Sequence, residues 1–284
     1  MNIFNKLDQL KDLTPNEQIL IQYIKEQPEK FVTQNASQIC KSCFVSSSTL
    51  YRLIRKLGLS GLSEFKIKIS ASIDYYLNND EELDYDYPIE ANVTQYQITH
   101  KMKQLYEQTI HSSMELIDLE QLRIVSFLLK KTPYIDFYTS AGNIYFAQNF
   151  KFQMQEIGRF VNVPIEEYHQ RLTASSGDNK HVALVISFSG RGKIMNDLMH
   201  ILKSNKTPIV LITSTKDNPL VPLADYCLYL SSNENHYNKI SSFATRLSLL
   251  YLLDCLYTCY FKLDYDENIK KKLESYAKLS GKYE

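Results

Sequence analysis

Residues 45–58 carry hydroxyl and guanidinium side chains at a spacing that suits contact with a DNA groove. The apolar residues of this segment recur every three or four positions, which predicts an amphipathic helix closed by Gly58. They are Leu50, Leu53, Ile54 and Leu57. On or near the opposite face, the same periodicity puts Thr49, Tyr51, Arg52, Arg55 and Lys56. A shorter helix over residues 35–43 and a tight turn come before it, so the two helices predict a DNA-reading helix-turn-helix.

The expected DNA contacts fall into two groups. The first group is expected to reach bases or nearby phosphates and comprises Ser47, Ser48, Thr49, Tyr51 and Arg52. Ser46, the predicted cap of the helix, is also included in the DNA-binding set. The second is expected to hold the phosphate backbone and comprises Arg55, Lys56 and Lys66. Residues 41–68 contain six Lys or Arg residues and one acid, Glu64. A local basic patch of this kind is what phosphate binding needs, although a short basic run is also typical of a solvated face.

A second group of polar residues follows three apolar runs that are predicted to be strands of a parallel sheet. Ligands bind at the carboxyl ends of such strands. The candidate ligand-binding residues are Ser140, Gly142, Asn143, Ser187, Ser189, Gly190, Thr213, Ser214 and Thr215. Residues 187–190 precede a predicted helix, so their hydroxyls and amides converge on a helix N-terminus, which suits a phosphate or other anion. Ordinary capping of that helix by serine is the alternative.

No convincing catalytic set accompanies these loops. A sugar isomerase needs a general base, usually Glu or His, over its substrate. Glu234 and His236 are the only such residues near the predicted pocket. Cys40 and Cys43 form one C-x-x-C without a second pair at zinc-finger spacing, which favours core packing over metal binding. We therefore expect no catalytic residue, no metal and no cofactor.

Helix and strand signals divide the chain into two folded parts. Thr14 is predicted to cap a first helix over residues 14–27, Asn35 the second helix and Ser46 the third. A fourth helix over 63–76 completes an all-helical domain of residues 1–77. The acidic residues 78–91 lack periodicity and are predicted to be a linker. In residues 92–284, helical patterns alternate with five apolar runs, near 134–138, 160–163, 181–186, 208–212 and 226–230. This alternation predicts an α/β domain with a five-stranded, mostly parallel sheet covered by helices on both faces.

Bulk properties restrict the class of protein further. The 284 residues suffice for two cores, and the formal net charge is zero, so affinity for DNA must come from a local patch. The five cysteines argue against a disulfide framework because their number is odd. No signal pattern opens the chain, and its longest apolar stretch, 247–261, is interrupted by polar residues. We therefore expect no membrane span and a cytoplasmic location.

The motifs of both parts resemble those of the RpiR/MurR-type bacterial transcriptional regulators, which join a helix-turn-helix to a sugar isomerase (SIS) domain. In the first part the resemblance lies in residues 13–17, 45–58 and 61–66. In the second part Ser187-Phe-Ser-Gly190 resembles the SIS phosphate loop, and residues 212–225 resemble the segment that leads to the fifth strand. The resemblance covers residues 5–262. It implies that the protein binds an operator DNA and a sugar phosphate or similar effector, and that it assembles as a homodimer or homotetramer.

Several positions depart from the pattern of that family. The first loop reads Thr139-Ser-Ala-Gly-Asn143 where Gly-x-Gly-x-Ser is usual, so Asn143 replaces the serine that contacts the sugar phosphate. Gly192 replaces a threonine usual after Ser-x-Ser-Gly. Phe44 occupies the turn before the recognition helix, where a small residue is common. A phenylalanine would strain a left-handed backbone there, and the alternative is that it fills the domain core.

The sequence thus predicts a transcriptional regulator whose SIS domain senses a sugar phosphate or related metabolite and which controls carbohydrate-metabolism genes. Signal transfer is expected to be a population shift, because an effector can favour only the arrangement that it binds better. Two alternatives stay open. One is a sugar phosphate isomerase with an added helical domain, and the other is a regulator whose degenerate sensor binds no effector.

Overall fold

The computed structural model describes residues 3–73, 83–214 and 217–281. The chain divides into two compact units, Met1–Leu105 and Tyr106–Glu284. The finer division into residues 1–77, 78–91 and 92–284 stays a prediction, and residues 78–82 of the predicted linker lie outside the described part. Among the described helices, none is both long and apolar enough to cross a membrane.

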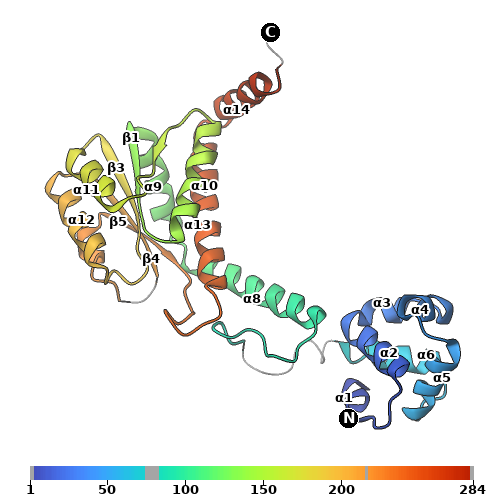
Figure 1. Cartoon of the computed structure of the whole chain (residues 1–284). Helices are drawn as coiled ribbons and strands as arrows, with labels where there is room; N and C mark the ends of the chain where they lie inside the picture. The colour runs from blue at the N-terminus through green and yellow to red at the C-terminus, as the bar shows by residue number, and fades with distance from the viewer. Residues whose placement is uncertain (1–2, 74–82, 215–216, 282–284) are drawn as a thin grey trace. The chain divides into compact units, whose positions relative to one another are not determined.

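Short helices build the described part of the N-terminal unit (Figure 1). They are α1 Ile3–Gln9, α2 Pro15–Glu26, α3 Pro28–Thr33, α4 Ala36–Cys43, α5 Ser47–Lys56 and α6 Leu62–Ser70. The sequence predicts α2, α4, α5 and α6 but omits α1 and α3. The prediction also carries α6 to Tyr76, whereas the helix ends at Ser70, and residues 74–76 lie outside the described part.

Side-chain caps fix where three of these helices begin. Thr14 Oγ1 accepts a hydrogen bond from the Glu17 backbone N–H (3.4 Å), and the Glu17 carboxylate accepts one from the Thr14 N–H (2.8 Å), which is a capping box. Asn35 takes part in a similar reciprocal pair at the start of α4. Ser46 Oγ accepts from the Thr49 N–H (3.2 Å) and caps α5. These caps are the ones that the sequence predicts.

The apolar side of α5 packs into a core to which α1 to α6 all contribute. Leu50 and Leu53 are completely buried, as their spacing predicts. Phe31 of α3 and Phe65 of α6 meet edge to face with ring centroids 5.2 Å apart. Burial of each such side chain contributes about 1.5–3 kcal/mol. This packing fixes α5 against α4 and leaves the polar side of α5 to solvent.

Phe44 occupies the turn between α4 and α5. Its backbone is left-handed (φ 53°, ψ 38°) and its side chain is 95% exposed, so the strained left-handed turn is confirmed and the alternative that the ring fills the core is wrong. The left-handed residue ends α4, because it lets the Val45 N–H bond to the Cys40 carbonyl at 3.0 Å. The geometry of the turn therefore outweighs burial of the ring, at a backbone cost of about 1–2 kcal/mol.

A five-stranded parallel sheet forms the centre of the C-terminal unit (Figure 1). Its strands are β1 Tyr134–Tyr138, β2 Val161–Asn162, β3 His181–Ile186, β4 Ile209–Ser214 and β5 Tyr226–Leu230, in the order β2-β1-β3-β4-β5. All the pairings are parallel, which confirms the predicted fold class. Because the strands run in one direction, their carboxyl ends lie at one edge of the sheet and their amino ends at the other.

Helices cover both faces of this sheet. They are α9 Leu119–Lys131, α10 Asn143–Glu156, α11 Glu167–Ser176, α12 Lys193–Ser204 and α13 Phe243–Lys262, with a short η1 at Val221–Leu223. The last helix, α14 Tyr265–Leu279, packs against α10 and α13. One face packs against α9, α10 and α13, and the other against α11 and α12 (Figure 1). The sequence prediction omits α11 and α14. The preceding helix, α8 Gln95–Leu116, begins in the first unit and ends in the second.

Candidate DNA-binding surface and effector pocket

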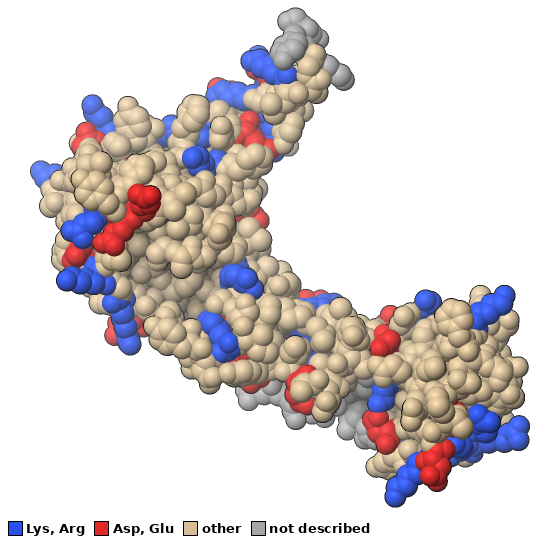
Figure 2. Space-filling model, in the orientation of Figure 1, with Lys and Arg blue, Asp and Glu red and all other residues tan. Residues whose placement is uncertain are grey.

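The outer side of α5 presents most of the side chains expected to contact DNA. Those exposed are Ser46, Ser47, Ser48, Tyr51, Arg52, Arg55 and Lys56, while Lys66 of α6 is half-buried. Figure 2 shows Lys and Arg atoms gathered on the side of the N-terminal unit where α5 lies, with fewer Asp and Glu atoms among them. Thr49 is buried, with 3% of its surface exposed, so the expectation that it lies on the outer face is wrong. Its hydroxyl lies 3.0 Å from Ser46 Oγ within the helix cap.

A buried carboxylate holds two of the expected DNA-contacting cations. Glu17 of α2 has no exposed surface, and its oxygens accept from Arg52 Nε at 2.9 Å and from Lys56 Nζ at 3.0 Å. Lys56 Nζ also donates to the Asp12 carbonyl at 2.9 Å. Arg52 and Lys56 therefore tie the recognition helix to α2. Their side chains nevertheless stay 51% and 30% exposed, so the same cations reach the surface.

The partners of Glu17 determine its pKa. Burial alone would raise the pKa, because it penalises the charged carboxylate. Hydrogen bonds from the Thr14 backbone, Lys56 and Arg52 outweigh that penalty and bring the pKa of Glu17 down from 4.5 to about 2. A carboxyl group with a lower pKa in the folded state stabilises the fold above its unfolded pKa. That stabilisation is lost as the pH falls through the folded pKa.

In the C-terminal unit, the carboxyl ends of β1, β3 and β4 border a cavity of about 630 Å³, called here the effector pocket. The loop after β1 contributes Asn143, the loop after β3 contributes Ser189, and the end of β4 contributes Ser214. The helices α10 and α12 begin directly after the first two loops. The first amides of α10 already donate to the carbonyls of residues 140–142, so the anion-binding amides expected at this edge of the sheet are those in the first turn of α12. Amides and hydroxyls together suit an anion.

The structure brings together part of the predicted ligand-binding set. Gly142, Asn143, Ser189 and Ser214 line the effector pocket, whereas Ser140, Ser187, Gly190 and Thr213 do not, and Thr215 lies outside the described residues. Thr213 is completely buried. Its hydroxyl donates to the Phe188 carbonyl at 3.2 Å and accepts from Asn218 Nδ2 at 2.6 Å. Thr213 therefore holds the loop that carries Ser189 and does not point into the pocket, contrary to the expectation.

Gly190 is required where two loops approach each other closely. Its φ is +64°, and a Cβ atom at this position would lie 1.7 Å from Asn218 Oδ1. Asn218 Nδ2 also donates to the Ser187 carbonyl at 2.9 Å. Asn218, in the loop after β4, thus fixes the conformation of the Ser-x-Ser-Gly loop by packing against Gly190 and bonding to Ser187. Sequence reasoning missed Asn218, because a single asparagine in a loop gives no signal of a partner 31 residues away.

Three cations line the effector pocket, which are Arg191, Lys239 and Arg246. The charge of Arg191 could be expected from its place after Ser-x-Ser-Gly. Sequence reasoning missed the other two, because only the fold brings them to the strand ends: Lys239 lies in the segment before α13, and Arg246 lies near the start of that helix, which begins at Phe243. Arg246 lies over the Phe243 ring, 5.6 Å from its centroid, and its Nε donates to the Ser242 carbonyl at 2.9 Å. The guanidinium is therefore held in place at the start of α13.

Glu234 and His236 also line the pocket, as the sequence suggests. Glu234 is buried, and its carboxylate accepts from the Ala244 N–H at 2.6 Å and from Thr245 Oγ1 at 2.6 Å. Lys239 Nζ lies 3.7 Å from the same carboxylate. Both carboxylate oxygens thus bind the first turn of α13, so Glu234 stabilises that helix N-terminus. A general base needs an oxygen directed at the substrate, and this arrangement directs both at the protein.

A chain of hydroxyl groups connects the end of β5 with α8. Ser231 follows β5 and precedes Ser232, which lines the effector pocket. The Ser231 N–H donates to Ser248 Oγ of α13 at 2.9 Å, and Ser113 of α8 donates to the same Ser248 Oγ at 2.8 Å. Ser112 of α8 donates to Ser231 Oγ at 2.9 Å. Because buried hydroxyls need partners, these bonds hold α8 in a fixed position against α13 and the residue that follows β5.

Comparison with known proteins finds relatives of both units. Residues 1–75 match the family described as helix-turn-helix domain, rpiR family, and residues 128–256 match the SIS domain. An uncharacterised HTH-type transcriptional regulator of Clostridium perfringens is 27% identical over 277 residues, which are 97% of this chain and 98% of the relative. Another, of Haemophilus influenzae, is 27% identical over 90% of this chain and 88% of the relative.

Solved structures share the fold at lower identity. The Vibrio vulnificus NanR protein complexed with ManNAc-6P has a TM-score of 0.60 and 17% identity, and the match covers 99% of this chain and 98% of that one. The sugar isomerase domain of the RpiR transcription factor from Sphaerobacter thermophilus has a TM-score of 0.56 and 9% identity, with 63% of this chain and 98% of that one covered.

The ion pairs of Glu17 lead to a prediction about acid stability. At neutral pH, Glu17→Gln should lower the free energy of unfolding by on the order of 2 kcal/mol, the pKa difference discounted for the exposed partners. The difference from wild type should shrink as the pH falls from about 4.5 towards 2, where Glu17 itself becomes protonated. Urea titrations followed by far-UV circular dichroism at several pH values measure it. Glu29→Gln, an exposed glutamate of α3, is the control, and a difference that is constant with pH would contradict the assignment.

Proposed function

This chain belongs to the RpiR-type transcriptional regulators, in which an rpiR-family helix-turn-helix precedes a SIS domain, and we propose that its SIS domain senses a sugar phosphate to control carbohydrate-metabolism genes. The observation that carries the proposal is the effector pocket, where hydroxyls and amides at the strand ends meet three cations. A phosphate group needs both several donors and positive charge. ManNAc-6P, the ligand of the Vibrio vulnificus NanR protein, is the first candidate to test.

We propose that the N-terminal unit binds operator DNA through α5. Ser47, Ser48 and Tyr51 are exposed near the start of the helix, where the recognition helix of such domains contacts base edges. Arg55 and Lys66 supply charge for the phosphate backbone. Arg52 and Lys56 have two roles in this proposal, because each joins α5 to Glu17 and also extends to the surface. A dimer or tetramer would present two such helices to major-groove faces about 34 Å apart.

The two alternative functions make different demands on the effector pocket. An isomerase needs a base, and Glu234, the buried carboxylate of the pocket, is bound to the first turn of α13. Because both oxygens of Glu234 are bonded to α13, neither is directed at a substrate, which favours a sensor over an enzyme. An effector-independent regulator would need none of the loop contacts made by Gly190 and Asn218, and their retention favours a working anion site. The non-enzymatic role and the intact sensor are both part of the proposal.

We propose that effector binding is communicated to α8 through the serine hydrogen bonds that hold this helix, which join Ser112 to Ser231 and Ser113 to Ser248. An effector shifts the population of two arrangements only if it binds one of them better. Arg246 and Ser248 lie two residues apart near the start of α13, so a phosphate that displaces Arg246 also acts on the helix that holds Ser113. The helix α8 then carries the change towards the N-terminal unit, because it begins there.

Removal of one pocket hydroxyl tests the effector assignment. Ser189→Ala should weaken binding of the tightest sugar phosphate, in a panel that includes ManNAc-6P, by roughly tenfold to a hundredfold, the value of one hydrogen bond to a charged group. Isothermal titration calorimetry measures it, and a thermal-shift screen of the same panel comes first, because a bound effector raises the unfolding temperature. Ser204→Ala, at the far end of α12, is the matched control. Equal binding by Ser189→Ala and wild type removes Ser189 from the site.

The two roles of the α5 cations can be separated by comparing Arg55→Ala with Arg52→Ala. Arg55→Ala should lower the salt dependence of DNA binding by about one phosphate contact without changing the free energy of unfolding. Arg52→Ala should weaken operator binding by about 1–3 kcal/mol and also lower stability, because Glu17 loses a partner. Gel-shift titrations at several salt concentrations measure binding, with Lys30→Ala of α3 as control. An Arg52→Ala protein of unchanged operator affinity would refute the DNA contact.

The serine connection predicts a variant that binds its effector but responds to it poorly. Ser112→Ala removes the bond to Ser231 and leaves the effector pocket and α5 untouched. Sugar-phosphate affinity should stay within about twofold of wild type, whereas the effector-induced change in DNA affinity should shrink by about 0.5–1.5 kcal/mol, the value of one hydrogen bond. DNA titrations with and without effector measure this coupling. Ser175→Ala, an exposed serine of α11, is the control, and an unchanged coupling energy sinks the proposed route.

A further inference from the structure

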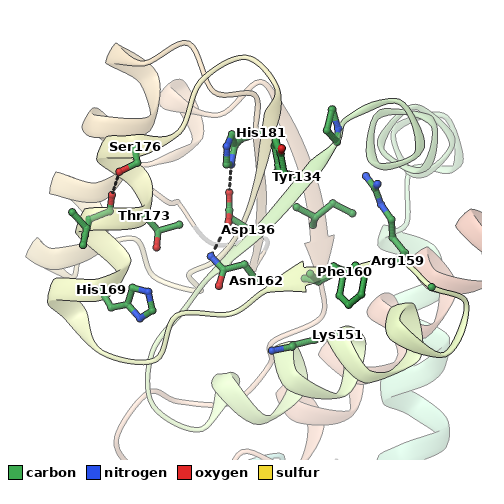
Figure 3. Close-up of a pocket in the computed structure, with 15 residues that line it drawn as sticks. Tyr134, Asp136, Lys151, Arg159, Phe160, Asn162, His169, Thr173, Ser176 and His181 are labelled. Carbon is green, nitrogen blue, oxygen red and sulfur yellow. Dashed lines mark hydrogen bonds and ion pairs between the residues drawn. The ribbon is translucent and has the colours of Figure 1, made fainter.

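A second cavity, of about 690 Å³, lies at the opposite edge of the same sheet, where β1 and β3 begin (Figure 3). It is called here the amino-edge cavity. Residues of β1, β2, β3, α10 and α11 line it. Its size falls in the range of small-molecule sites. The effector pocket lies past the other ends of β1 and β3, so the two cavities have no lining residue in common.

A buried carboxylate forms the floor of the amino-edge cavity. Asp136 of β1 is 3% exposed, and its two oxygens are engaged by Asn162 Nδ2 at 2.9 Å and by His181 Nδ1 at 2.6 Å. A carboxylate can only accept, so Nδ1 of His181 carries the hydrogen and Nε2 is the nitrogen left for another partner. Tyr134 stacks on the imidazole with ring centroids 4.8 Å apart. The imidazole is thus oriented on two sides within a wall of the cavity.

The charged groups of the lining other than Asp136 are two cations. They are Lys151 of α10 and Arg159, and the imidazole of His169 of α11 faces them from the other side (Figure 3). Arg159 Nη2 donates to the carbonyls of Leu129 and Thr132, so this guanidinium is anchored to the backbone. Asp136 is the single acid in the lining, and its oxygens are already engaged. The excess of cationic groups attracts an anion.

A metal ion does not fit this lining. Within the described part of the chain, no group of three or more His, Cys, Asp or Glu residues is arranged to hold one. Apolar surface surrounds the polar floor instead. Tyr134 is 55% exposed, Phe160 77% and Leu172 51%, although all three line the cavity. Aromatic rings exposed beside fixed polar groups are typical of sites for amphipathic small molecules.

We propose that the amino-edge cavity is a second ligand site, which takes a small organic anion carrying a flat ring. Its acidic group lies between Lys151 and His169, and its ring covers Tyr134 or Phe160. His181 Nε2 meets a polar substituent of the ring, held in place by Asp136. This site goes beyond the sugar-phosphate sensor, since it uses other residues at the other edge of the sheet.

Phenyl phosphate is the probe, with inorganic phosphate as the anion without a ring and benzyl alcohol as the ring without a charge. The full-length protein should bind phenyl phosphate more tightly than either of these. The double variant Lys151→Met/His169→Gln should weaken binding by at least roughly tenfold, because it removes the charge-assisted hydrogen bond of Lys151 and the imidazole donor of His169. Both replaced side chains reach the surface and leave Asp136 and His181 intact. Thr173→Lys, which adds a cation to the lining, should strengthen binding. Calorimetry measures each dissociation constant, and Lys262→Met is the control.

Arg246→Met separates this site from the effector pocket. Binding of phenyl phosphate should be unchanged in Arg246→Met if the amino-edge cavity holds it, whatever the fate of the sugar-phosphate proposal. Loss of binding in Arg246→Met but not in Lys151→Met/His169→Gln would overturn the inference, as would equal affinity for phenyl phosphate and inorganic phosphate. A lower molecular mass in solution for Phe160→Ser, without any binding of phenyl phosphate to wild type, would assign the surface to a second copy of the chain and would equally overturn it.

Discussion

A carboxylate buried in a protein must be surrounded by donors, and this demand sets the geometry of every site described in this chain. Glu17 joins α2 to the recognition helix through Arg52 and Lys56. Glu234 holds the start of α13 beside the effector pocket, and Asp136 orients His181 in the amino-edge cavity. In each case the acid is hidden and its partners form the functional surface. Removal of such an acid would leave its partners without the contacts that position them.

Under the proposed function, the arrangement around Glu17 couples folding to DNA binding. Arg52 and Lys56 neutralise a carboxylate that has no exposed surface, so neither cation is purely a DNA ligand. Phosphates that approach α5 compete with Glu17 for the same charges, but the guanidinium of Arg52 has further N–H groups to offer. These long side chains lose conformational entropy when the protein folds, so little further entropy is lost when they contact DNA. The recognition helix is therefore preorganised for the groove by an interaction that lies beneath it.

Most of the fold could be predicted from local pattern, and most of the site could not. Caps at Thr14, Asn35 and Ser46 and the apolar runs of the strands depend on neighbours in sequence, so they appear in the sequence itself. The helix α11 was missed because adjacent glutamates at its start resemble a solvated loop. Asn218 and Arg246 act on residues that only the fold brings near, and no spacing rule anticipates them. The prediction for Thr49 and the alternative of a buried Phe44 are wrong for a related reason. Thr49 is buried because its hydroxyl takes part in the helix cap, and Phe44 is exposed because the turn fixes its backbone.

The departures of the sensor loops from the family pattern acquire a physical meaning when the pocket is considered as a whole. Asn143 and Gly192 leave fewer hydroxyls at the strand ends, while Gly190 and Asn218 keep the backbone of the Ser-x-Ser-Gly loop in shape. Under the proposed function, more of the recognition of an anion then falls to Arg191, Lys239 and Arg246. Arg246 is carried by α13, the same helix whose Ser248 seats α8. On that proposal, an anion held by Arg246 acts on α13 and therefore on the Ser248 contact with α8, whereas an anion held only by the loop hydroxyls would act on the strand ends.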